Sequence, residues 1–485
     1  FQLKAQSHLQ GLAVHLPAPL AKTKAQSRAL RVEWKPIQAQ QDQLQIHLGD
    51  DVVAVFESST STPQGFVRGA VGWNQGQPAL PTTGLVLDLA SAELDIEPWL
   101  NWLGPLWQQA GTSSFQWPTL ERLRLKADKV TGFAQQWQHL TFTLQAQPKS
   151  QWRADMSASQ VAGTVWWTPA RTSTGSALVQ ADLQRLYWQP APTTQEETPT
   201  KEFDLRLPDM QLHVSDLRWG QRQLGKLKAQ GRASAQDATR WQITDLSLTT
   251  PHGTVQATGD WILVGAQRGL YVDTYLESQD VGRWLRQLAW PDSLTHGELQ
   301  AQATLQWRHL PWRHSTKDLQ AEFNVLLKRG RISAIHSRAA KLLEFLSLQS
   351  LSRIARLDLD VRGVLQEGFP FNEIQGIAVL KEERLKTKDL RIVSPVGVIV
   401  LEGETDLQAE LVDAQVVVVP NVDMSGAAIA AGIALNPVVG LSAFLTQWVL
   451  KVPLAKAMTT YYHIFGPWDS IQIEELKIKE PETAF

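Results

Sequence analysis

The feature that most constrains the fold of this 485-residue chain is an alternation of apolar and polar residues in many short segments. In "LQAQATLQWRHL", apolar residues from Leu299 to Trp307 alternate with Gln and Thr, and "LTFTLQAQ", "FDLRLPDMQLHV" and "LDLDVRGV" repeat the pattern. A period of two predicts a β-strand with one apolar and one solvated face. Such one-sided strands are typical of antiparallel sheets. Only Val416–Val419 reads as a strand buried on both faces.

An internal repeat supports this interpretation. The segment "DLSLTTPHGTVQATG" from Asp245 and the segment "DLRIVSPVGVIVLEG" from Asp389 match at a constant offset of 144 residues. Each has Ser or Thr, Pro, any residue and Gly at its centre, which is the order of a type I turn. Each copy is therefore predicted to be a strand, a tight turn and a second strand.

Few segments interrupt the strands. The stretch "QPAPTTQEETPTKE" is rich in Pro, Thr and charge, and we interpret it as a linker. It divides the chain into predicted β segments 1–188 and 203–335, the linker 189–202, and a C-terminal region 336–485 that contains helices. Length alone allows two to four domains.

Helical periodicity is confined to three places. "SRAAKLLEFLSLQSL", from Ser337, has an apolar face beside Lys341 and Glu344. "PWLNWLGPLWQQA", from Pro98, predicts a shorter helix that is broken at Pro105. The third place is the stretch from Met424 to Leu450, which contains no charged residue.

The uncharged stretch from Met424 to Leu450 raises the question of membrane contact. A spanning helix needs about 20 apolar residues, and Pro437 leaves only thirteen on either side. Three alternatives remain open: a buried helical pair, a hairpin that touches a membrane surface, and a true span.

Composition excludes several classes of function. The net charge is −2, from 46 basic and 48 acidic residues, so the electrostatic signature of a nucleic-acid-binding protein is missing. The chain has no Cys, which excludes disulfides, thiol nucleophiles and zinc–cysteine sites. It does not begin with Met, and we expect it to be a fragment. The 20 Trp residues suit either irregular strand ends or places that are half apolar and half wet.

No motif indicates catalysis. The eleven His residues are scattered, and His309 and His314 flank "LPWR" without carboxylates at metal spacing. We find no phosphate loop, nucleophile elbow or nucleotide fingerprint. Asp358 and Asp360 alternate with apolar residues, so we place them on the solvated face of a strand. We therefore expect no catalytic residues, metal or cofactor.

The apolar strand faces must be covered by something. If ten strands each left three apolar side chains in water, the cost would reach tens of kcal/mol, beyond a net stability of about 5 to 15 kcal/mol. A second sheet could cover them and form a sandwich. Alternatively, the sheet could curl into a trough filled by an apolar ligand. Periodicity alone does not separate the two.

The C-terminal third resembles a known family. "LLEFLSLQSLSRIARLDLD", "GFPFNEIQGIAVL", "TKDLRIVSPVGVIVLEGETDL", "VVVVPNVD", "NPVVGLSAFLTQWVL" and "YYHIFGPWDSIQIEEL" resemble, in order and spacing, the end of AsmA-like envelope proteins, most closely the YhdP branch. The N-terminal "LQGLAVHLPAPLAKTKAQSRALRVEW" is also similar to that branch. "HSRAAKLL" departs from the Pro-Gly-Ala-Gly-Arg-Leu-Leu-like lead into the first helix that is usual in the family.

This resemblance implies an elongated, curved, antiparallel β-sheet that forms an apolar groove, with a few helices near its C-terminal end. It implies the periplasmic part of an inner-membrane-anchored protein of Gram-negative bacteria, with its anchor absent from this chain, that carries phospholipid between the two membranes. The expected partners are phospholipid and the inner leaflet of the outer membrane or envelope proteins. The alternatives are a structural or assembly scaffold with a dry β core and, third, an enzyme acting on envelope glycans or lipids.

Two sets of residues are candidates for lipid contact. The predicted groove lining consists of Leu140, Phe142, Leu144, Leu299, Leu305, Leu357, Leu359 and Val361. The predicted membrane-contact residues of the uncharged stretch are Ile429, Ile433, Leu441, Phe444, Leu445 and Trp448. A one-residue shift in strand phase would exchange the lining and solvated sets.

Overall fold

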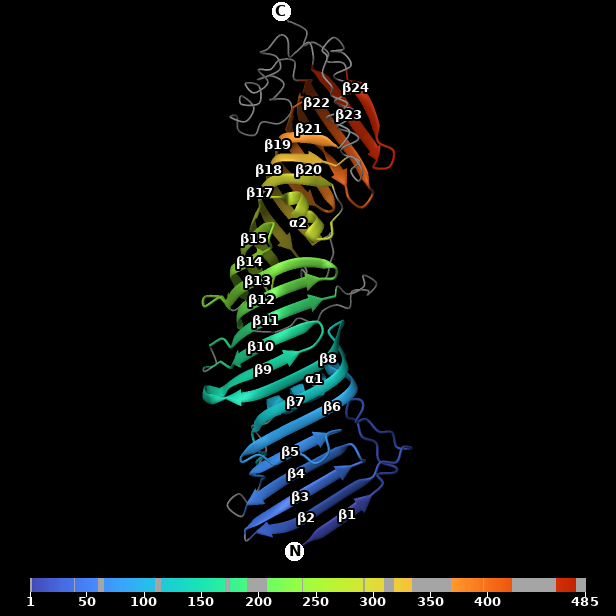
Figure 1. The fold of residues 1–485 in the computed structure, drawn as a ribbon, viewed down its shortest axis with the longest axis vertical. Coiled ribbons are helices and arrows are strands. Elements are labelled where there is room, and N and C mark those ends of the chain that lie inside the picture. Colours follow the sequence, from blue (N-terminus) through green and yellow to red (C-terminus); the bar gives the residue numbers. More distant parts are fainter. Residues whose placement is uncertain are drawn as a thin grey trace, which may run out of the picture. The chain divides into compact units, whose positions relative to one another are not determined.

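The computed structural model confirms a mainly β fold with few helices (Figure 1). It describes residues 2–38, 40–59, 65–109, 115–170, 172, 175–189, 207–237, 239–290, 293–308, 318–333, 368–395, 397–420 and 459–476. These residues form 24 strands and two α-helices. The chain divides into two compact units. Unit 1 is Phe1–Pro192 with Leu207–Gly220, and unit 2 is Thr193–Arg206 with Gln221–Phe485.

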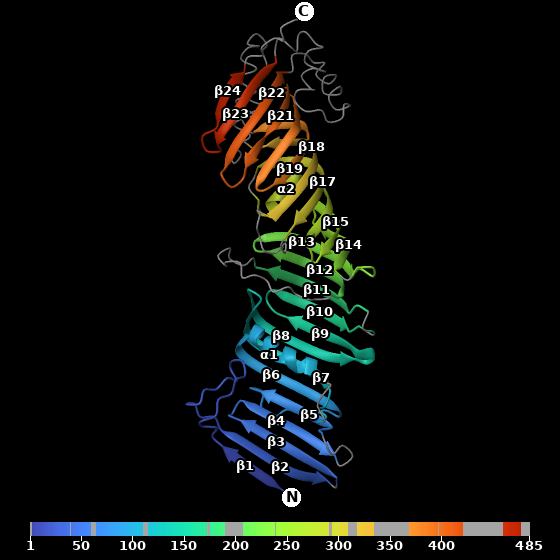
Figure 2. The same cartoon turned by 180° about the vertical axis from the view of Figure 1, so that it is seen from behind.

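Unit 1 contains a ladder of twelve strands in which each strand pairs with the next along the chain (Figure 2). No pairing joins its first and last described strands, so the sheet is open. The helix α1, Ile96–Gln109, lies between β6 and β7 in the chain. The strands are β1 Leu3–Ser7, β2 Leu30–Gln38, β3 Gln41–Leu48, β4 Val52–Ser59, β5 Arg68–Trp73, β6 Gly84–Asp95, β7 Leu120–Gly132, β8 Gln135–Gln147, β9 Gln151–Ser157, β10 Val161–Thr168, β11 Leu178–Trp188 and β12 Asp209–Trp219.

Unit 2 contains a second ladder of twelve strands, also paired in chain order and antiparallel throughout. The short helix α2, Val281–Gln287, lies between β16 and β17 in the chain. The strands are β13 Arg222–Ala233, β14 Arg240–Thr249, β15 Gly253–Ile262, β16 Gly269–Ser278, β17 Leu294–Trp307, β18 Leu319–Ile332, β19 Phe369–Lys381, β20 Arg384–Ser394, β21 Gly397–Asp406, β22 Leu411–Pro420, β23 Thr460–Pro467 and β24 Gln472–Leu476.

The sheet of unit 1 is mixed, which corrects the expectation of a purely antiparallel sheet. The pairs β5–β6, β6–β7 and β11–β12 are parallel. Parallel neighbours need a connection long enough to bring the chain back to the end of the sheet at which the first strand began. Residues 74–83, the helix α1 with its flanking loops, and residues 189–208 provide these connections. Alternation within a strand does not encode the direction of its neighbour.

The repeat found in the sequence is a pair of hairpins with the same register. In β14–β15, Leu246 lies opposite Ala257, and in β20–β21 the equivalent Leu390 lies opposite Leu401. Both hairpins also contain a register shift at the same position of the repeat. In the first copy, the Thr250 hydroxyl accepts a hydrogen bond from the Gly253 backbone N–H at 2.9 Å. The predicted strand, turn and strand are confirmed.

The four valines Val416–Val419 are all buried, with exposed fractions of 1 to 3%. Opposite them on β21, Val398 and Val400 are buried as well. Because neighbouring residues of a strand point to opposite faces, both faces are shielded from water here. The prediction of one strand buried on both sides is confirmed.

The predicted break at Pro105 is wrong, because α1 continues to Gln109. Proline removes one backbone hydrogen bond and costs a helix interior about 3 kcal/mol. Ile96 and Trp99 of α1 pack on the buried cluster formed by Trp73, Leu94, Leu125, Ala127 and Val130. We infer that this burial offsets the lost bond. The short helix α2 was not predicted.

Several predictions lie outside the described residues. They are the helix from Ser337, the uncharged stretch from Met424 to Leu450, and the site residues within them or beside them. These site residues are Leu357, Leu359, Val361, Ile429, Ile433, Leu441, Phe444, Leu445 and Trp448.

Candidate functional site

One face of the unit 1 sheet carries an unbroken row of apolar side chains. Residues that lie opposite each other in a ladder point to the same face, so the strand registers show which side chains line up. Across twelve strands the row contains no polar residue. From β1 to β12 it consists of Ala5, Val32, Ile46, Ala54, Val71, Leu87, Leu123, Leu144, Ala154, Val165, Ala181 and Leu212.

On the opposite face, the neighbouring row is polar from β6 to β12, whereas β4 and β5 place the buried residues Val55 and Ala70 on that face. The row one residue further along, from β6 to β12, consists of Asp88, Arg124, Thr143, Asp155, Thr164, Asp182 and His213. The Asp155 carboxylate accepts hydrogen bonds from Thr164 at 2.6 Å and from Arg153 at 3.0 Å. Partial burial opposes the effect of these two donors, but together they lower the pKa of Asp155. From β6 to β12, the two rows are therefore chemically distinct.

Unit 2 also has a row of this kind across its twelve strands, and the row contains no charged residue. From β13 to β24 its row consists of Ala229, Leu246, Ala257, Thr274, Ala303, Phe323, Ala378, Thr387, Gly403, Ala414, Ile464 and Ile473. We call the face that carries these rows the apolar face of each unit.

The apolar face of unit 1 is shielded less completely than an ordinary core, whereas the same face of unit 2 carries a buried cluster that includes Ile399, Val416 and Ile464. In the unit 1 row, Val32, Val71, Leu144 and Val165 are half-buried, whereas Ala54 is buried. Each unit contains one ladder, and no second sheet is present among the described strands. A sandwich of two sheets is therefore not the way in which these strands cover their apolar side chains.

The five described residues of the predicted lining are half-buried. Leu140 and Phe142 pack against the cluster around Leu125, and Leu144 lies in the unit 1 row. In unit 2, Leu299 lies opposite Leu327, and Leu305 lies opposite Val272 and Ala321.

Strand phase is not constant along unit 1. In β7, both Ala127 and Val130 are buried in one cluster although they are three residues apart, and in β8 both Trp137 and Leu140 pack on that cluster. The alternation therefore shifts by one residue in neighbouring strands. His139, at the shift, has a φ of 55°, in the left-handed region.

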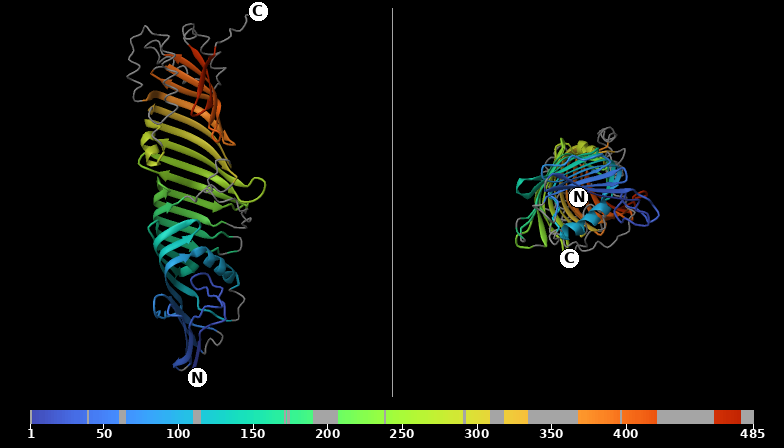
Figure 3. Two further views of the ribbon diagram at one scale, coloured as in Figure 1. Left: turned by 90° about the vertical axis from the view of Figure 1, so that its right-hand side faces the viewer. Right: turned by 90° about the horizontal axis from the view of Figure 1, so that it is seen from below.

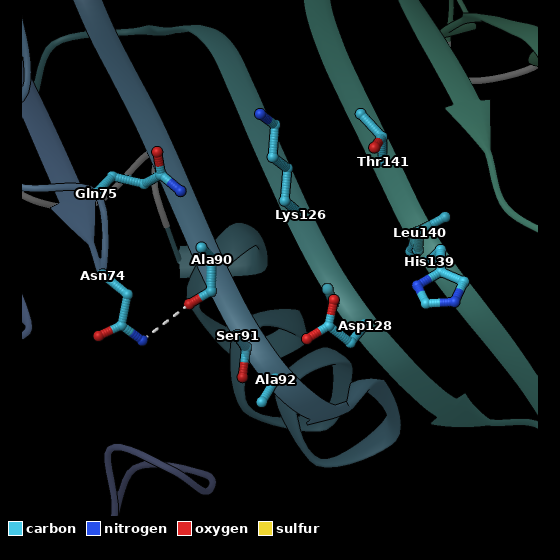
Figure 4. A pocket seen from close by; sticks show the side chains of 11 residues that line it. Asn74, Gln75, Ala90, Ser91, Ala92, Lys126, Asp128, His139, Leu140 and Thr141 are labelled. Atoms are coloured by element: carbon cyan, nitrogen blue, oxygen red, sulfur yellow. Dashed lines mark hydrogen bonds between the residues drawn. The ribbon is translucent and has the colours of Figure 1, made fainter.

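A polar depression of about 420 Å³ lies beside this shift (Figure 4). Lys126, Asp128, His139 and Thr141 line it, and the Asn74 side chain donates to the Ala90 carbonyl at 3.0 Å. Lys126 and Thr141 neighbour Leu125 and Phe142 in their strands, so they point away from the apolar face. The depression contains no residue of the apolar row, but Ala127 and Leu140 of the buried cluster also line it.

Each of the two helices packs on the apolar face of its unit, as Figure 3 shows for α1 beside β7. The start of α1 places Ile96 on Gly132 of β7, where a methyl group on the glycine would come within 2.4 Å of the Ile96 side chain. The start of α2 places Val281 on Gly297 of β17 with a corresponding distance of 3.3 Å. The glycines allow each helix to approach the sheet closely.

A second sequence repeat, at an offset of 185 residues, underlies this similarity and was not recognised from the sequence. "GLVLDLASAELDIEPWLNWL" from Gly84 and "GLYVDTYLESQDVGRWLRQL" from Gly269 each combine a strand with the start of a helix. The identical positions of the first copy are Gly84, Leu85, Asp88, Asp95, Trp99, Leu100 and Leu103. The spacing Asp-(Ile/Val)-x-x-Trp-Leu was the signal that could have revealed α2.

One polar cluster joins neighbouring strands of unit 1. The Tyr187 hydroxyl donates to Asp216 at 2.6 Å, and Arg218 donates to the same carboxylate at 3.0 Å. The bond to Asp216 raises the pKa of Tyr187. This cluster ties together the parallel strands β11 and β12. No group of His, Asp or Glu in the described ranges is arranged to hold a metal ion.

Comparison with known proteins identifies the family. The family described as YhdP protein matches residues 1–473 of the chain. The chain belongs to the YhdP family. The predicted relationship to the YhdP branch of AsmA-like proteins is thus confirmed. No solved structure matches the chain.

One curated relative in the YhdP family covers almost the whole chain. It is the intermembrane phospholipid transporter YhdP of Escherichia coli (strain K12), which is 24% identical over 509 residues. The match includes 99% of this chain but only 37% of the relative. The chain therefore spans about a third of the length of that transporter. Within the described ranges, no helix is long and apolar enough to cross a membrane.

Proposed function

We propose that the chain is a segment of a lipid conduit whose apolar faces carry the acyl chains of phospholipids. The observation that supports this proposal best is the pair of apolar rows, each of which crosses twelve strands without a charged side chain. Most residues of the unit 1 row are half-buried, four residues of the unit 2 row are buried, and neither row faces a second sheet among the described strands. A flexible apolar guest would complete their burial.

A conduit of this kind needs no catalytic residue. Each CH₂ group of an acyl chain gains about 0.8 kcal/mol when it leaves water. A chain of roughly 16 carbons therefore faces a barrier of more than 10 kcal/mol if it crosses an aqueous gap alone. A continuous apolar row keeps the free energy of the chain nearly level from strand to strand, so movement requires neither bond formation nor bond cleavage.

The ligand and the location are proposed from the relative. Its name describes a transporter of phospholipid between membranes. By extension we propose phospholipid as the ligand of this chain and the periplasm of a Gram-negative envelope as its location, within a longer protein anchored in the inner membrane. Contact with the inner leaflet of the outer membrane or with envelope proteins is part of the same proposal.

A charge on the apolar face tests the conduit. Leu305→Asp places a carboxylate between Val272 and Ala321, where an acyl chain would have to desolvate it. We expect co-purified phospholipid, counted by native mass spectrometry, to fall about tenfold, which corresponds to about 1.4 kcal/mol. Gln302→Asp in the same strand is the control, because Gln302 is exposed and lies opposite Tyr275 and Asn324.

Circular dichroism of both variants establishes that the sheet is intact. Unchanged lipid content in a folded Leu305→Asp variant would contradict the conduit. Wild-type protein that carries no phospholipid after gentle purification would favour the dry scaffold instead.

A further inference from the structure

Trp284 of α2 combines deep burial with an unused donor. Its side chain is 5% exposed, and its indole N–H has no hydrogen-bond partner among the described residues. One turn later, the side-chain oxygen of Gln287 is also buried without a partner in that part of the chain. Buried polar atoms are nearly always paired, because leaving them unpaired costs free energy. Two such atoms in one short helix indicate that a partner is missing.

The equivalent residue in unit 1 has its partner. The Trp99 indole N–H donates to the Ala18 carbonyl, in the loop between β1 and β2, at 3.0 Å. The two helices start from the same sequence pattern and pack on the same kind of face. Of these two tryptophans, only Trp284 therefore lacks a described acceptor.

The position of Trp284 indicates the chemistry of the missing partner. Its ring covers Gly253, the first residue of β15, and the same face of that strand continues through Val255, which lies opposite Leu276. Trp284 thus lies at the end of β15, where the apolar face stops beside the hydrogen-bonded turn from Thr250 to Gly253. In a phospholipid, the ester groups lie at the corresponding boundary between acyl chains and headgroup.

We propose that Trp284 and Gln287 form a subsite for the ester and headgroup region of a phospholipid whose acyl chain lies on Val255 and Leu276. The Trp284 indole N–H donates to an ester carbonyl oxygen, and the Gln287 oxygen accepts from an N–H or O–H group of the headgroup. Both protein atoms are closed to water in the structure, so α2 lifts from the sheet to admit the lipid. This inference rests on the proposed conduit and adds a fixed position to it.

Ester-linked and ether-linked lipids distinguish this subsite from general apolar binding. Diacyl phosphatidylethanolamine has ester carbonyls, and dialkyl phosphatidylethanolamine of equal chain length lacks them. When equal amounts of the two compete for the 485-residue chain, we expect native mass spectrometry to show roughly a two- to tenfold excess of the diacyl lipid, as one neutral hydrogen bond provides.

Matched substitutions locate the source of that preference. Trp284→Phe removes the donor but keeps an aromatic ring, and we expect the two lipids to bind equally to this variant. Trp99→Phe is the control, because its donor is already occupied by Ala18, and we expect this variant to keep the preference.

Each outcome has a separate meaning. Equal binding of both lipids by the wild-type chain, or an undiminished preference in Trp284→Phe, would overturn the subsite while leaving the conduit in place. Binding of neither lipid would overturn the conduit itself. The wild-type comparison requires no variant, so the test stands even if Trp284→Phe folds poorly.

Discussion

The helices α1 and α2 begin with the same sequence pattern but differ in length. α1 has 14 residues and α2 has 7, so at 1.5 Å per residue they are about 21 Å and 10 Å long. The long helix and its loops return the chain along β6, and β7 runs parallel to β6; after the short helix, β17 runs antiparallel to β16. The shared helix start thus docks both helices on the apolar face, but it does not determine the direction of the next strand.

The contacts of the two helices also differ. Trp99 is half-buried, lies near Trp73 with ring centroids 6.4 Å apart, and has a hydrogen-bond acceptor. Trp284 is more deeply buried but has no acceptor in the described part of the chain. Trp99 is thus held by a hydrogen bond as well as by packing, whereas Trp284 is held by packing.

The largest expected difference between the two helices concerns removal of the tryptophans. Trp284→Ala deletes a nearly fully buried ring and should destabilise α2 and its strands by about 3 to 5 kcal/mol. Trp99→Ala deletes a half-buried ring and should cost about half as much. Hydrogen exchange of peptides from β15–β17 and β5–β7 measures the two effects locally. A larger loss of protection around α1 would reverse the comparison.

Glycine substitutions beneath the helices should have a smaller effect. Gly132→Ala places a methyl group 2.4 Å from Ile96, and overpacking of this kind typically costs about 1 to 3 kcal/mol. At Gly297, a methyl group would require only a small shift of Val281, but the φ of 95° disfavours any side chain by about 1 to 2 kcal/mol.

Valine substitutions separate these two causes. Gly132→Val should be much worse than Gly132→Ala, because steric overlap grows with side-chain size. At Gly297, the further destabilisation from the alanine to the valine variant should be smaller, because the alanine variant already carries the backbone strain. Thermal unfolding of the four variants gives the comparison. An equal further fall in unfolding temperature from alanine to valine at the two sites would show that packing is equally tight.

The smallest expected effect concerns the aspartates that precede the helices. Asp280 accepts from the Arg283 backbone N–H at 3.0 Å, whereas Asp95 accepts from the Glu97 backbone N–H at 3.3 Å. Loss of an N-cap costs roughly 1 kcal/mol, so Asp280→Ala should destabilise its helix by about that amount and Asp95→Ala by less. Local hydrogen exchange of each helix measures the difference. A stronger effect of Asp95→Ala would show that the two caps are not ranked by their bond lengths.

Much of the fold could be predicted because alternation is a local signal. Leu140, Phe142 and Leu305 could be placed on apolar strand faces from their neighbours alone, and Val416–Val419 could be recognised because the alternation stops there. The hairpin repeat was readable because its turn chemistry lies within four residues.

The parts that were missed depend on distant or short-range features that periodicity does not report. The parallel pairs depend on connections such as 74–83, and the phase shift near His139 depends on one left-handed residue in β8. α2 spans only about two turns, too few to show a period of 3.6 residues. α1 continues past Pro105, although a proline disfavours a helix interior and no local pattern predicts the continuation.

The most direct test of the conduit is photo-crosslinking from adjacent positions of one strand. A photoreactive phenylalanine analogue at Val165 would lie in the apolar row, and the same analogue at Thr164 would lie on the polar face. After irradiation in cells, we expect phospholipid adducts from position 165 and at most a background level from position 164. Equal labelling at the two positions, or no lipid adduct at position 165, would contradict the conduit.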